Sequence, residues 1–296
     1  MKTGTKLSLR ELLKKDGVIV APGCIDVPSA KIVEGLGFPA VYLGGWATGA
    51  KLGVTEPLTT MTEMVREASY ITRRCDIPLI VDADAGFGDA THTRRTVLEF
   101  IRAGVSAIHI EDQMFPKRVG YHVGLKYVIP IEEMLVKIRT ALDARGDSDM
   151  LIIARTDSRE AENGSLEDAV ERCRKFAELG ADVIMPYSCR PPSYEEACYV
   201  GKSIKAPLLY VNDESDHPNL TVDQIASAGF KIIIYPLTAS LAAAQATKSA
   251  YTHLKEKGVT YLSPEAEQMV QVRKVVEDSA GIPELYAIEK KDGRAL

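Results

Sequence analysis

Eight short apolar runs rich in β-branched residues alternate along this chain with longer segments of helical periodicity. Each run is almost continuously apolar, which is typical of parallel strands that are buried on both faces. The runs cover residues 18–21, 40–43, 79–82, 107–111, 151–155, 183–185, 208–211 and 231–235. Eight strand–helix repeats in this order predict an α/β protein of the closed (β/α)₈, or TIM-type, barrel class.

The segments between these runs support the repeat. Helical patterns cover residues 61–73, 93–103, 166–179 and 222–228, and Gly104 and Gly180 stand where the second and third of these helices would end. The alternative is an open parallel sheet with an added domain. That fold would favour a glycine-rich fingerprint after the first strand, which the single Gly23 does not supply. We therefore expect one barrel domain over residues 1–296.

Two stretches exceed a minimal barrel repeat. Residues 113–129 form a long connection after the fourth strand, rich in Lys, Arg, Gly and Tyr, and loops of this length often serve as lids. Residues 241–296 form a C-terminal extension with helical pattern over 241–257, 264–278 and 282–291. So much surplus helix predicts packing against another subunit.

The overall charge excludes some classes of partner. A net charge of −5 gives no field that would favour nucleic acid or an anionic membrane. The basic stretch 1–15 lacks the apolar core of a signal peptide, and no run approaches the roughly 18 apolar residues that a spanning helix needs. No two of the five cysteines show CxxC spacing, so we expect reduced thiols. These features predict a soluble, cytoplasmic protein that acts on a small molecule.

Charged residues stand at the predicted carboxyl ends of three successive strands. Asp82 and Asp84 end the third, Glu111 ends the fourth and Arg155 ends the fifth. Active sites of (β/α)₈ barrels lie at this end. Carboxylates completed by water and substrate oxygens are what Mg²⁺ prefers, and an arginine can hold a substrate carboxylate through two parallel hydrogen bonds. The pattern predicts a magnesium site that binds a carboxylate.

Each of these features also has a structural interpretation. The pair Asp82 and Asp84 could form an ordinary turn, Glu111 could be a solvated strand end, and Arg155 could bridge to a nearby aspartate such as Asp157. Their coincidence on successive strands favours the functional interpretation. His109 lies in the middle of the fourth strand, and we expect it to be a packed core histidine.

Six motifs occur along the chain in an order that resembles the isocitrate lyase / phosphoenolpyruvate mutase superfamily. They are Asp26-Val27-Pro28-Ser29-Ala30, Asp82-Ala83-Asp84-Ala85-Gly86-Phe87-Gly88, Ile110-Glu111-Asp112-Gln113, Pro116-Lys117-Arg118, Ile153-Ala154-Arg155-Thr156-Asp157 and Tyr235-Pro236-Leu237. The resemblance spans nearly the whole chain, on the branch of short bacterial and fungal enzymes. It implies a barrel whose eighth helix is swapped between paired subunits, usually in a homotetramer built as a dimer of dimers.

The resemblance also implies roles for individual residues. It implies Mg²⁺, with Mn²⁺ as a substitute, held by Asp82 and Asp84, with Glu111 in the water-mediated shell and Arg155 on a substrate carboxylate. It implies further contacts to a small carboxylate substrate from Tyr42, Gly44, Gly45, Trp46, Glu56, Tyr187 and Asn212. Gly44, Glu56 and Tyr187 depart from the family, which usually places serine, aspartate and glutamate there.

The lid departs further from the family pattern. Family lyases that split methylisocitrate-like substrates carry Lys-Lys/Arg-Cys-Gly-His, where this chain reads Lys117-Arg118-Val119-Gly120-Tyr121-His122. The family cysteine protonates the leaving carbanion, and such an acid must lie within hydrogen-bond reach of the carbon. Valine cannot donate a proton, so Tyr121, with an ordinary pKa near 10, or His122 would have to replace it. The candidate catalytic residues are Lys117, Tyr121, His122 and Arg155.

A Mg²⁺-dependent reaction that forms an enolate without a dedicated carbon acid fits this lid best. Decarboxylation of oxaloacetate or another 3-substituted 2-oxo acid is such a reaction, because water can protonate the enolate carbon. The main alternative is carbon–carbon cleavage of a methylisocitrate or alkylmalate, with Tyr121 or His122 as the acid. A phosphonate mutase or hydrolase and a non-catalytic binding protein are further alternatives, although the retained Asp84 and Arg155 argue against the last.

Overall fold

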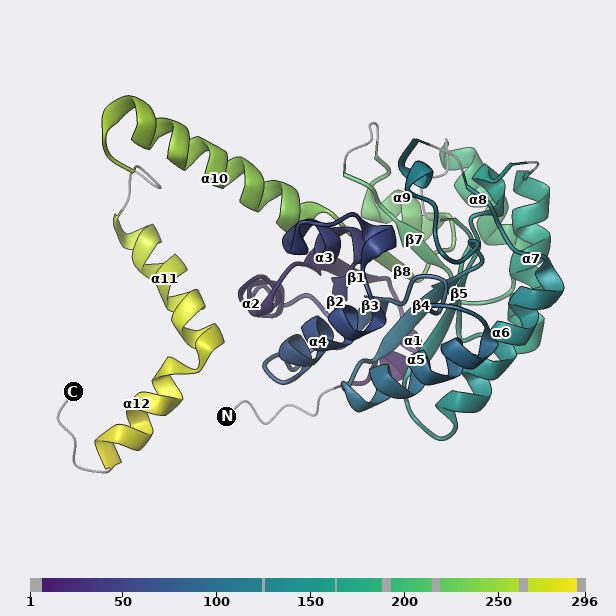
Figure 1. The fold of residues 1–296 in the computed structure, drawn as a ribbon, viewed down its shortest axis with the longest axis horizontal. Coiled ribbons are helices and arrows are strands. Elements are labelled where there is room, and N and C mark those ends of the chain that lie inside the picture. The colour runs from purple at the N-terminus through teal and green to yellow at the C-terminus, as the bar shows by residue number, and fades with distance from the viewer. Residues whose placement is uncertain are drawn as a thin grey trace.

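Eight parallel strands surround one axis in the computed structural model, which describes residues 7–123, 126–162, 164–187, 193–214, 219–260 and 266–291 (Figure 1). They are β1 (Ile19–Cys24), β2 (Val41–Leu43), β3 (Leu79–Asp82), β4 (Ala107–Glu111), β5 (Leu151–Arg155), β6 (Val183–Met185), β7 (Leu209–Val211) and β8 (Ile232–Tyr235). Their order is β6-β5-β4-β3-β2-β1-β8-β7, and a parallel bridge between Ile184 and Leu208 joins β6 to β7. The predicted (β/α)₈ barrel is confirmed.

Helices follow the strands as the repeat predicts. They are α1 (Leu9–Leu13), α2 (Val27–Gly35), α3 (Gly45–Leu52), α4 (Met61–Thr72), α5 (Ala90–Arg102), α6 (Ile131–Arg145), α7 (Leu166–Leu179), α8 (Tyr194–Ser203), α9 (Val222–Ser227), α10 (Thr238–Lys257), α11 (Ala266–Ala280) and α12 (Ile282–Lys291). Short 3₁₀ turns are η1 (Glu56–Leu58), η2 (Val119–Val123) and η3 (Ser158–Glu160). Gly180 ends α7 with a φ of 99°, the left-handed conformation that favours glycine.

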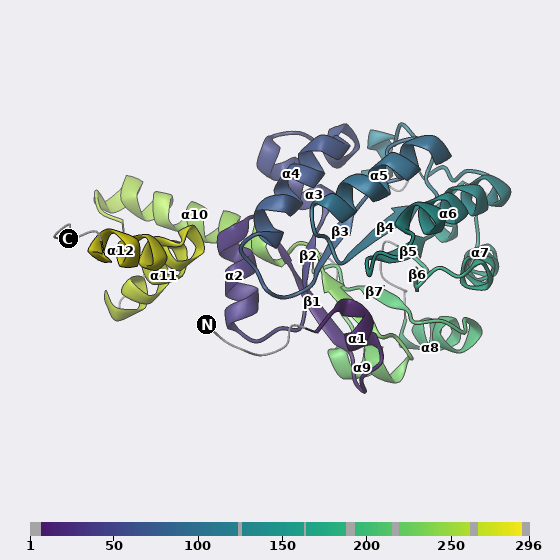
Figure 2. The ribbon, with the colours of Figure 1, turned by 90° about the horizontal axis from the view of Figure 1, so that it is seen from below.

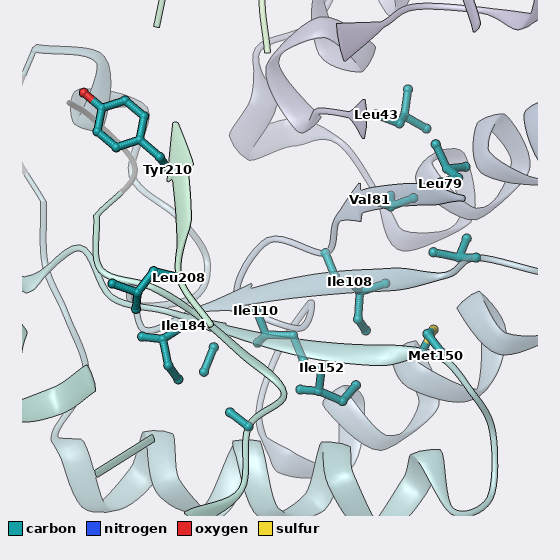
Figure 3. Packing of buried hydrophobic residues seen from close by; sticks show 14 of the residues in the cluster. Leu43, Leu79, Val81, Ile108, Ile110, Met150, Ile152, Ile184, Leu208 and Tyr210 are labelled. Atoms are coloured by element: carbon teal, nitrogen blue, oxygen red, sulfur yellow. The ribbon is translucent and has the colours of Figure 1, made fainter. Parts of the chain in front are cut away.

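Side-chain alternation along each strand divides the core into two layers. Ile108 and Ile110 point outward from β4 and pack in the cluster between strands and helices, together with Ile152 and Leu208 (Figure 3). Ala107, which precedes them on the same strand, belongs to a second cluster inside the barrel. Because successive side chains of a strand face opposite sides, the later members of this inward series, which include Glu111, reach the interior at the carboxyl end of the barrel.

The amino end of the barrel is closed by the short helix α1. Leu9 is buried in the interior cluster, with Leu12 and Leu13 packed partly against it. Ser8 caps the helix by accepting from the N–H of Glu11, whose side chain accepts in return from the N–H of Ser8. The sequence patterns did not indicate this helix, because five residues are too few to show a helical period.

The last three helices leave the barrel as a C-terminal arm, residues 238–291 (Figures 1 and 2). Helix α10 follows β8 but runs outward, and α11 returns to pack against α2. Arg74 of the segment after α4 donates to the carbonyl oxygen of Ser279 at 3.1 Å. Many apolar side chains of the arm are exposed, among them Leu241, Tyr251, Leu254, Val270, Val276, Leu285 and Ile288.

Two further expectations concern the chain as a whole. Within the described ranges, none of the helices has the length and apolar character needed to cross a membrane. Cys24, Cys75, Cys173 and Cys198 are free thiols, as expected, whereas Cys189 lies outside the described residues. Burial raises the pKa of the Cys24 thiol far above its ordinary value, so this side chain is unreactive.

Candidate active site

β3 ends in a tight turn that carries both predicted metal-binding aspartates. Asp84 has a φ of 49°, a left-handed conformation that is uncommon for a residue other than glycine. The Asp82 carboxylate accepts hydrogen bonds from the N–H of Asp84 at 2.8 Å and of Gly45 at 3.2 Å. The buried Lys137 of α6 donates to the carbonyl oxygen of Ala85. These contacts fix two buried carboxylates at the mouth of the barrel.

Glu111 and Arg155 extend this cluster across the next two strands. They are register partners on β4 and β5, and Arg155 Nη1 lies 2.8 Å from Glu111 Oε2. Burial raises the pKa of Glu111 to about 8, although Arg155 and Lys117 act in the opposite direction. Arg155 Nη2 also donates to Asp157 Oδ2 at 2.9 Å. The aspartate bridge considered from the sequence is therefore present, and it coexists with a contact to the cluster.

The lid places the ammonium group of Lys117 among the carboxylates. Its Nζ lies 2.5 Å from Glu56 Oε1, 2.9 Å from Glu111 Oε1 and 3.7 Å from Asp84 Oδ2. Burial lowers the pKa of Lys117, but Glu111, Glu56 and Asp84 outweigh it and raise that pKa well above its ordinary value. The lysine therefore stays charged. Opposite charge, rather than apolar contact, holds this part of the lid in the barrel mouth.

Two lid residues that matter for proton transfer take opposite positions. The Tyr121 hydroxyl donates to Glu56 Oε2, and the Lys117 ammonium lies 4.6 Å from the centre of the Tyr121 ring. Val119, at the position of the family cysteine, is 53% exposed. Burial and the charge of Glu56 raise the pKa of Tyr121, so it is a neutral proton carrier. The side chain of His122 lies outside the described part of the structure.

Beneath the carboxylates, Tyr42 and His109 form the floor of the site. The Tyr42 hydroxyl lies 3.0 Å from His109 Nε2, and His109 Nδ1 lies 3.6 Å from Asp82 Oδ1. Both side chains are buried, and burial lowers the pKa of His109 to about 4. His109 is thus neutral and packed, as expected, and it separates the charged cluster from the apolar interior.

Comparisons with known proteins fit this geometry. The family model described as "Phosphoenolpyruvate phosphomutase" matches residues 9–255. The 2-methylisocitrate lyase of Aeropyrum pernix is 42% identical over 254 residues, which cover 85% of this chain and 80% of that protein. The chain belongs to the isocitrate lyase / phosphoenolpyruvate mutase superfamily. Several curated relatives are named lyases, and the chain is accordingly an enzyme of the carbon–carbon lyase class.

Solved structures of the superfamily share the whole fold. Oxaloacetate acetylhydrolase in complex with the inhibitor 3,3-difluorooxalacetate superimposes with a TM-score of 0.88 at 32% identity, covering 98% of this chain and 97% of that one. Phosphonopyruvate hydrolase in complex with oxalate and Mg²⁺ superimposes with a TM-score of 0.81 at 28% identity, covering 97% and 98%. These relatives bind small dicarboxylates.

Other substrate-binding residues implied by the superfamily pattern lie at different distances from the cluster. Gly45 touches it directly, since a Cβ there would stand 3.0 Å from Asp82 Oδ2, whereas a Cβ at Gly44 would meet the Tyr42 ring. Trp46 is 36% exposed. The Tyr187 ring packs against Tyr210 and Phe230 in the hydrophobic core, and the structure does not bring it to the carboxylates.

Asn212 stands at the end of β7 and is nearly fully buried. Its Nδ2 donates to the carbonyl oxygen of Leu220 at 3.2 Å, while its Oδ1 accepts no hydrogen bond from the described residues. An unpaired acceptor at the carboxyl end of a strand is compatible with the predicted contact to a ligand, which stays a prediction.

Sequence reasoning missed a polar network beside the cluster. The fully buried Asp112 accepts from the Thr156 hydroxyl at 2.6 Å, from the N–H of Asp157 at 2.9 Å and from Arg172 Nη1 at 3.2 Å. Burial raises the pKa of Asp112 to about 6, against the hydrogen bond from Thr156. The sequence did contain a signal for this residue, because Asp112 follows Glu111 in a superfamily motif. A functional role was assigned only to Glu111.

The metal expected for this superfamily can be tested against the donors present. Among the described residues, no three Asp, Glu, His or Cys side chains converge as a ready metal cage, so Asp82, Asp84 and Glu111 do not form one. Mg²⁺ needs only one or two carboxylates, because waters and substrate complete its shell. Neither oxygen of the buried Glu111 receives a well-aligned hydrogen bond, despite the two nearby cations. The carboxylate oxygens that surround the Lys117 ammonium are hard donors, and this donor set therefore fits Mg²⁺.

Proposed function

We propose that this enzyme cleaves a carbon–carbon bond in a small 2-hydroxy di- or tricarboxylate of the alkylmalate type, with Mg²⁺ as cofactor and Tyr121 as the acid. The observation that carries the proposal is the lid: the Tyr121 hydroxyl enters the charged cluster, while Val119 is turned to solvent. The similarity to a 2-methylisocitrate lyase supports the substrate class. Mg²⁺, when bound, would stabilise the negative charge of the deprotonated 2-hydroxyl.

The residues of the chain divide the remaining work. The Arg155 guanidinium would hold a substrate carboxylate at the end of β5. After the 2-hydroxyl loses its proton, the C2–C3 bond breaks, a carbonyl forms at C2, and the bond's electrons remain on C3 beside a carboxylate. The Tyr121 hydroxyl then gives its proton to C3, and solvent returns to Tyr121 the proton that the 2-hydroxyl released. Such a carbanion is a far stronger base than a phenolate, so the raised pKa of Tyr121 does not prevent the transfer.

A proton-NMR time course tests this function. The enzyme is incubated with 2-methylisocitrate, with 2,3-dimethylmalate and with oxaloacetate, each in Mg²⁺ and again in EDTA. The expected result is Mg²⁺-dependent loss of one branched malate, with equal amounts of a 2-oxo acid and a second carboxylate formed: propionate from 2,3-dimethylmalate or succinate from 2-methylisocitrate. Absence of cleavage of both branched malates, under conditions where oxaloacetate is consumed, contradicts it.

Decarboxylation of oxaloacetate, the leading expectation from the sequence, is the second candidate. The exposure of Val119 favours it, because no thiol lies at the carbon and water can protonate the enolate. Its signature is pyruvate formation above the Mg²⁺-only background and without oxalate. Insensitivity of this rate to Tyr121→Phe distinguishes it from the lyase reaction.

We further propose that the C-terminal arm joins subunits into a homo-oligomer, with a dimer of dimers as the assembly. Apolar side chains on α10 and α12, such as Leu254 at 42% and Ile288 at 58% exposure, are left partly open to solvent by the described residues of the chain. Light scattering during size exclusion should give about four times the chain mass, and Leu254→Asp should reduce it. A monomer at micromolar concentration contradicts the proposal.

A further inference from the structure

Asp157, two residues beyond the end of β5, connects the arginine of the site to the lid. Its carboxylate accepts two hydrogen bonds from Arg155, from Nη2 to Oδ2 at 2.9 Å and from Nε to Oδ1 at 3.4 Å. The same Oδ2 accepts from Gln113 Nε2 at 2.7 Å, and Lys126 Nζ lies 3.8 Å from Oδ1. Asp157 and these three partners are all buried.

Gln113 and Lys126 belong to opposite limbs of the lid. The limbs pair through an antiparallel bridge between Gln113 and Val128 and through the N–H of Met114, which donates to the carbonyl oxygen of Tyr127 at 2.8 Å. One carboxylate therefore contacts both limbs at the lid base and the guanidinium of the site. A displacement of the lid base would therefore change the charge and hydrogen bonds around Asp157.

The backbone of Asp157 is held by a separate set of contacts. Its N–H donates to Asp112 Oδ1 at 2.9 Å, and Asp112 is fixed in turn by Arg172, which also donates to the carbonyl oxygen of Ile129 at 3.0 Å. The main chain at Asp157 thus has a fixed support. What the lid base can alter is the side-chain rotamer, and with it the plane of the Arg155 guanidinium.

We propose that Asp157 is a positioning residue that couples closure of the lid base to the orientation of Arg155. The inference rests on the proposed function, in which Arg155 binds a substrate carboxylate. The contact through Nε and Nη2 fixes the guanidinium plane and directs its Nη1 end toward Glu111 and the cluster. Loss of Gln113 from Oδ2 loosens that plane. Because coupling is reciprocal, a carboxylate bound at Arg155 favours the closed lid.

Oxalate, in saturating Mg²⁺, is the probe for the first experiment. Calorimetry should show that Asp157→Asn weakens oxalate binding about tenfold and Gln113→Leu about fivefold, with the double variant no weaker than Asp157→Asn alone. The control is Glu160→Gln, which removes the second partner of Lys126 without touching Arg155 and should stay within about twofold. The coupling is contradicted if the two weakening factors multiply in the double variant, or if Gln113→Leu leaves the affinity for oxalate unchanged.

A second experiment uses no ligand, so that failure of the function and failure of the coupling can be separated. Lys117 is buried, and tryptic cleavage after it reports opening of the lid. Gln113→Leu should speed this cleavage several-fold, and so should Arg155→Met, but the latter only while Asp157 is present. Without the coupling, Arg155→Met would slow cleavage, because Glu111 would then pair more strongly with Lys117.

The combined outcomes assign the failure. If the wild-type protein binds no oxalate, the proposed function is contradicted. If Arg155→Met still accelerates tryptic cleavage in that case, and does so only while Asp157 is present, the coupling is retained. If the protein binds oxalate but the effects of Asp157→Asn and Gln113→Leu on affinity are additive, the proposed function is retained and the coupling is contradicted. Circular dichroism and thermal melting verify folding, and if Asp157→Asn is unfolded, Gln113→Leu and Arg155→Met decide the result alone.

Discussion

The two ends of the barrel are closed by opposite means. At the amino end, α1 inserts Leu9 into an apolar layer, and its outer face is tied by Arg10 Nη1, which donates to Asp182 Oδ1 at 3.0 Å. At the carboxyl end, the lid inserts Lys117 among buried carboxylates. The amino end lowers the free energy by removing apolar surface from water. The carboxyl end keeps charges out of water, which is costly unless they are paired.

This difference separates stability from function within one barrel. A buried cluster of Asp82, Asp84, Glu111 and Glu56 would be unfavourable without a cation, and Lys117 and Arg155 supply positive charge from the chain itself. Substitutions at the carboxyl end should therefore change catalysis more than folding. Substitutions at the amino end should do the reverse, and the following experiments test that division.

The largest expected effect is that of Asp84→Ala. Loss of this carboxylate should reduce turnover at least about a thousandfold, because the site loses a hard oxygen donor for Mg²⁺. It should also abolish the rise in melting temperature that Mg²⁺ causes in the wild type. Asp89→Ala is the matched control: Asp89 is exposed and caps α5, so its loss should lower the melting temperature slightly and leave activity unchanged. Near-normal turnover of Asp84→Ala in excess Mg²⁺ would contradict the assignment of Asp84 as a metal ligand.

Leu9→Ala should have the opposite profile. The side chain is 1% exposed, so its truncation should lower the free energy of unfolding by about 2–3 kcal/mol in urea titrations. The kcat and KM of the folded fraction should not change, because the site lies at the other end of the barrel. Leu36→Ala, at a position that is 72% exposed, should change stability by less than about 0.5 kcal/mol. A large change in KM for Leu9→Ala would mean that the two ends are coupled.

The sequence pattern predicted the strands of the barrel better than it predicted the structures that close its two ends. The strands β3, β4, β5 and β6 have the predicted bounds, because a parallel strand buried on both faces is written as a continuous apolar run. The positions of Asp82, Asp84, Glu111 and Arg155 follow from that register, since each strand end meets its neighbour at the barrel mouth.

The remaining features of the site depend on contacts between residues far apart in the chain, which leave no periodic pattern in the sequence. The burial of Lys117, Lys126 and Lys137 could not be read from the chain, because lysine is ordinarily a surface residue and each here is held by a distant partner. Tyr187 shows the converse. A strand-end position suggested the pocket, but the backbone beyond β6 directs its ring toward Tyr210 in the core.

Tyr121→Phe tests the chemistry of the carboxyl end with the smallest structural change. Removing one hydroxyl should lower lyase turnover about 100-fold, the lower end of the usual contribution of a general acid, and leave the melting temperature within a few degrees. Tyr127→Phe, in the same lid but stacked on Arg118, is the control and should keep full activity. If both variants behave alike, Tyr121 is a packing residue and water supplies the proton.

The smallest effect is expected from Val119→Cys, which restores the thiol that the superfamily's lyases carry. Because Val119 is half exposed and Tyr121 occupies the cluster, a thiol at 119 should change turnover of a branched malate by no more than about threefold. The informative measurement is the double variant Val119→Cys with Tyr121→Phe. Failure of the thiol to restore activity would mean that the lid of this chain places its acid two residues later along η2, as the structure indicates. Restoration would mean that the lid can turn residue 119 inward and that Tyr121 is one of two interchangeable acids.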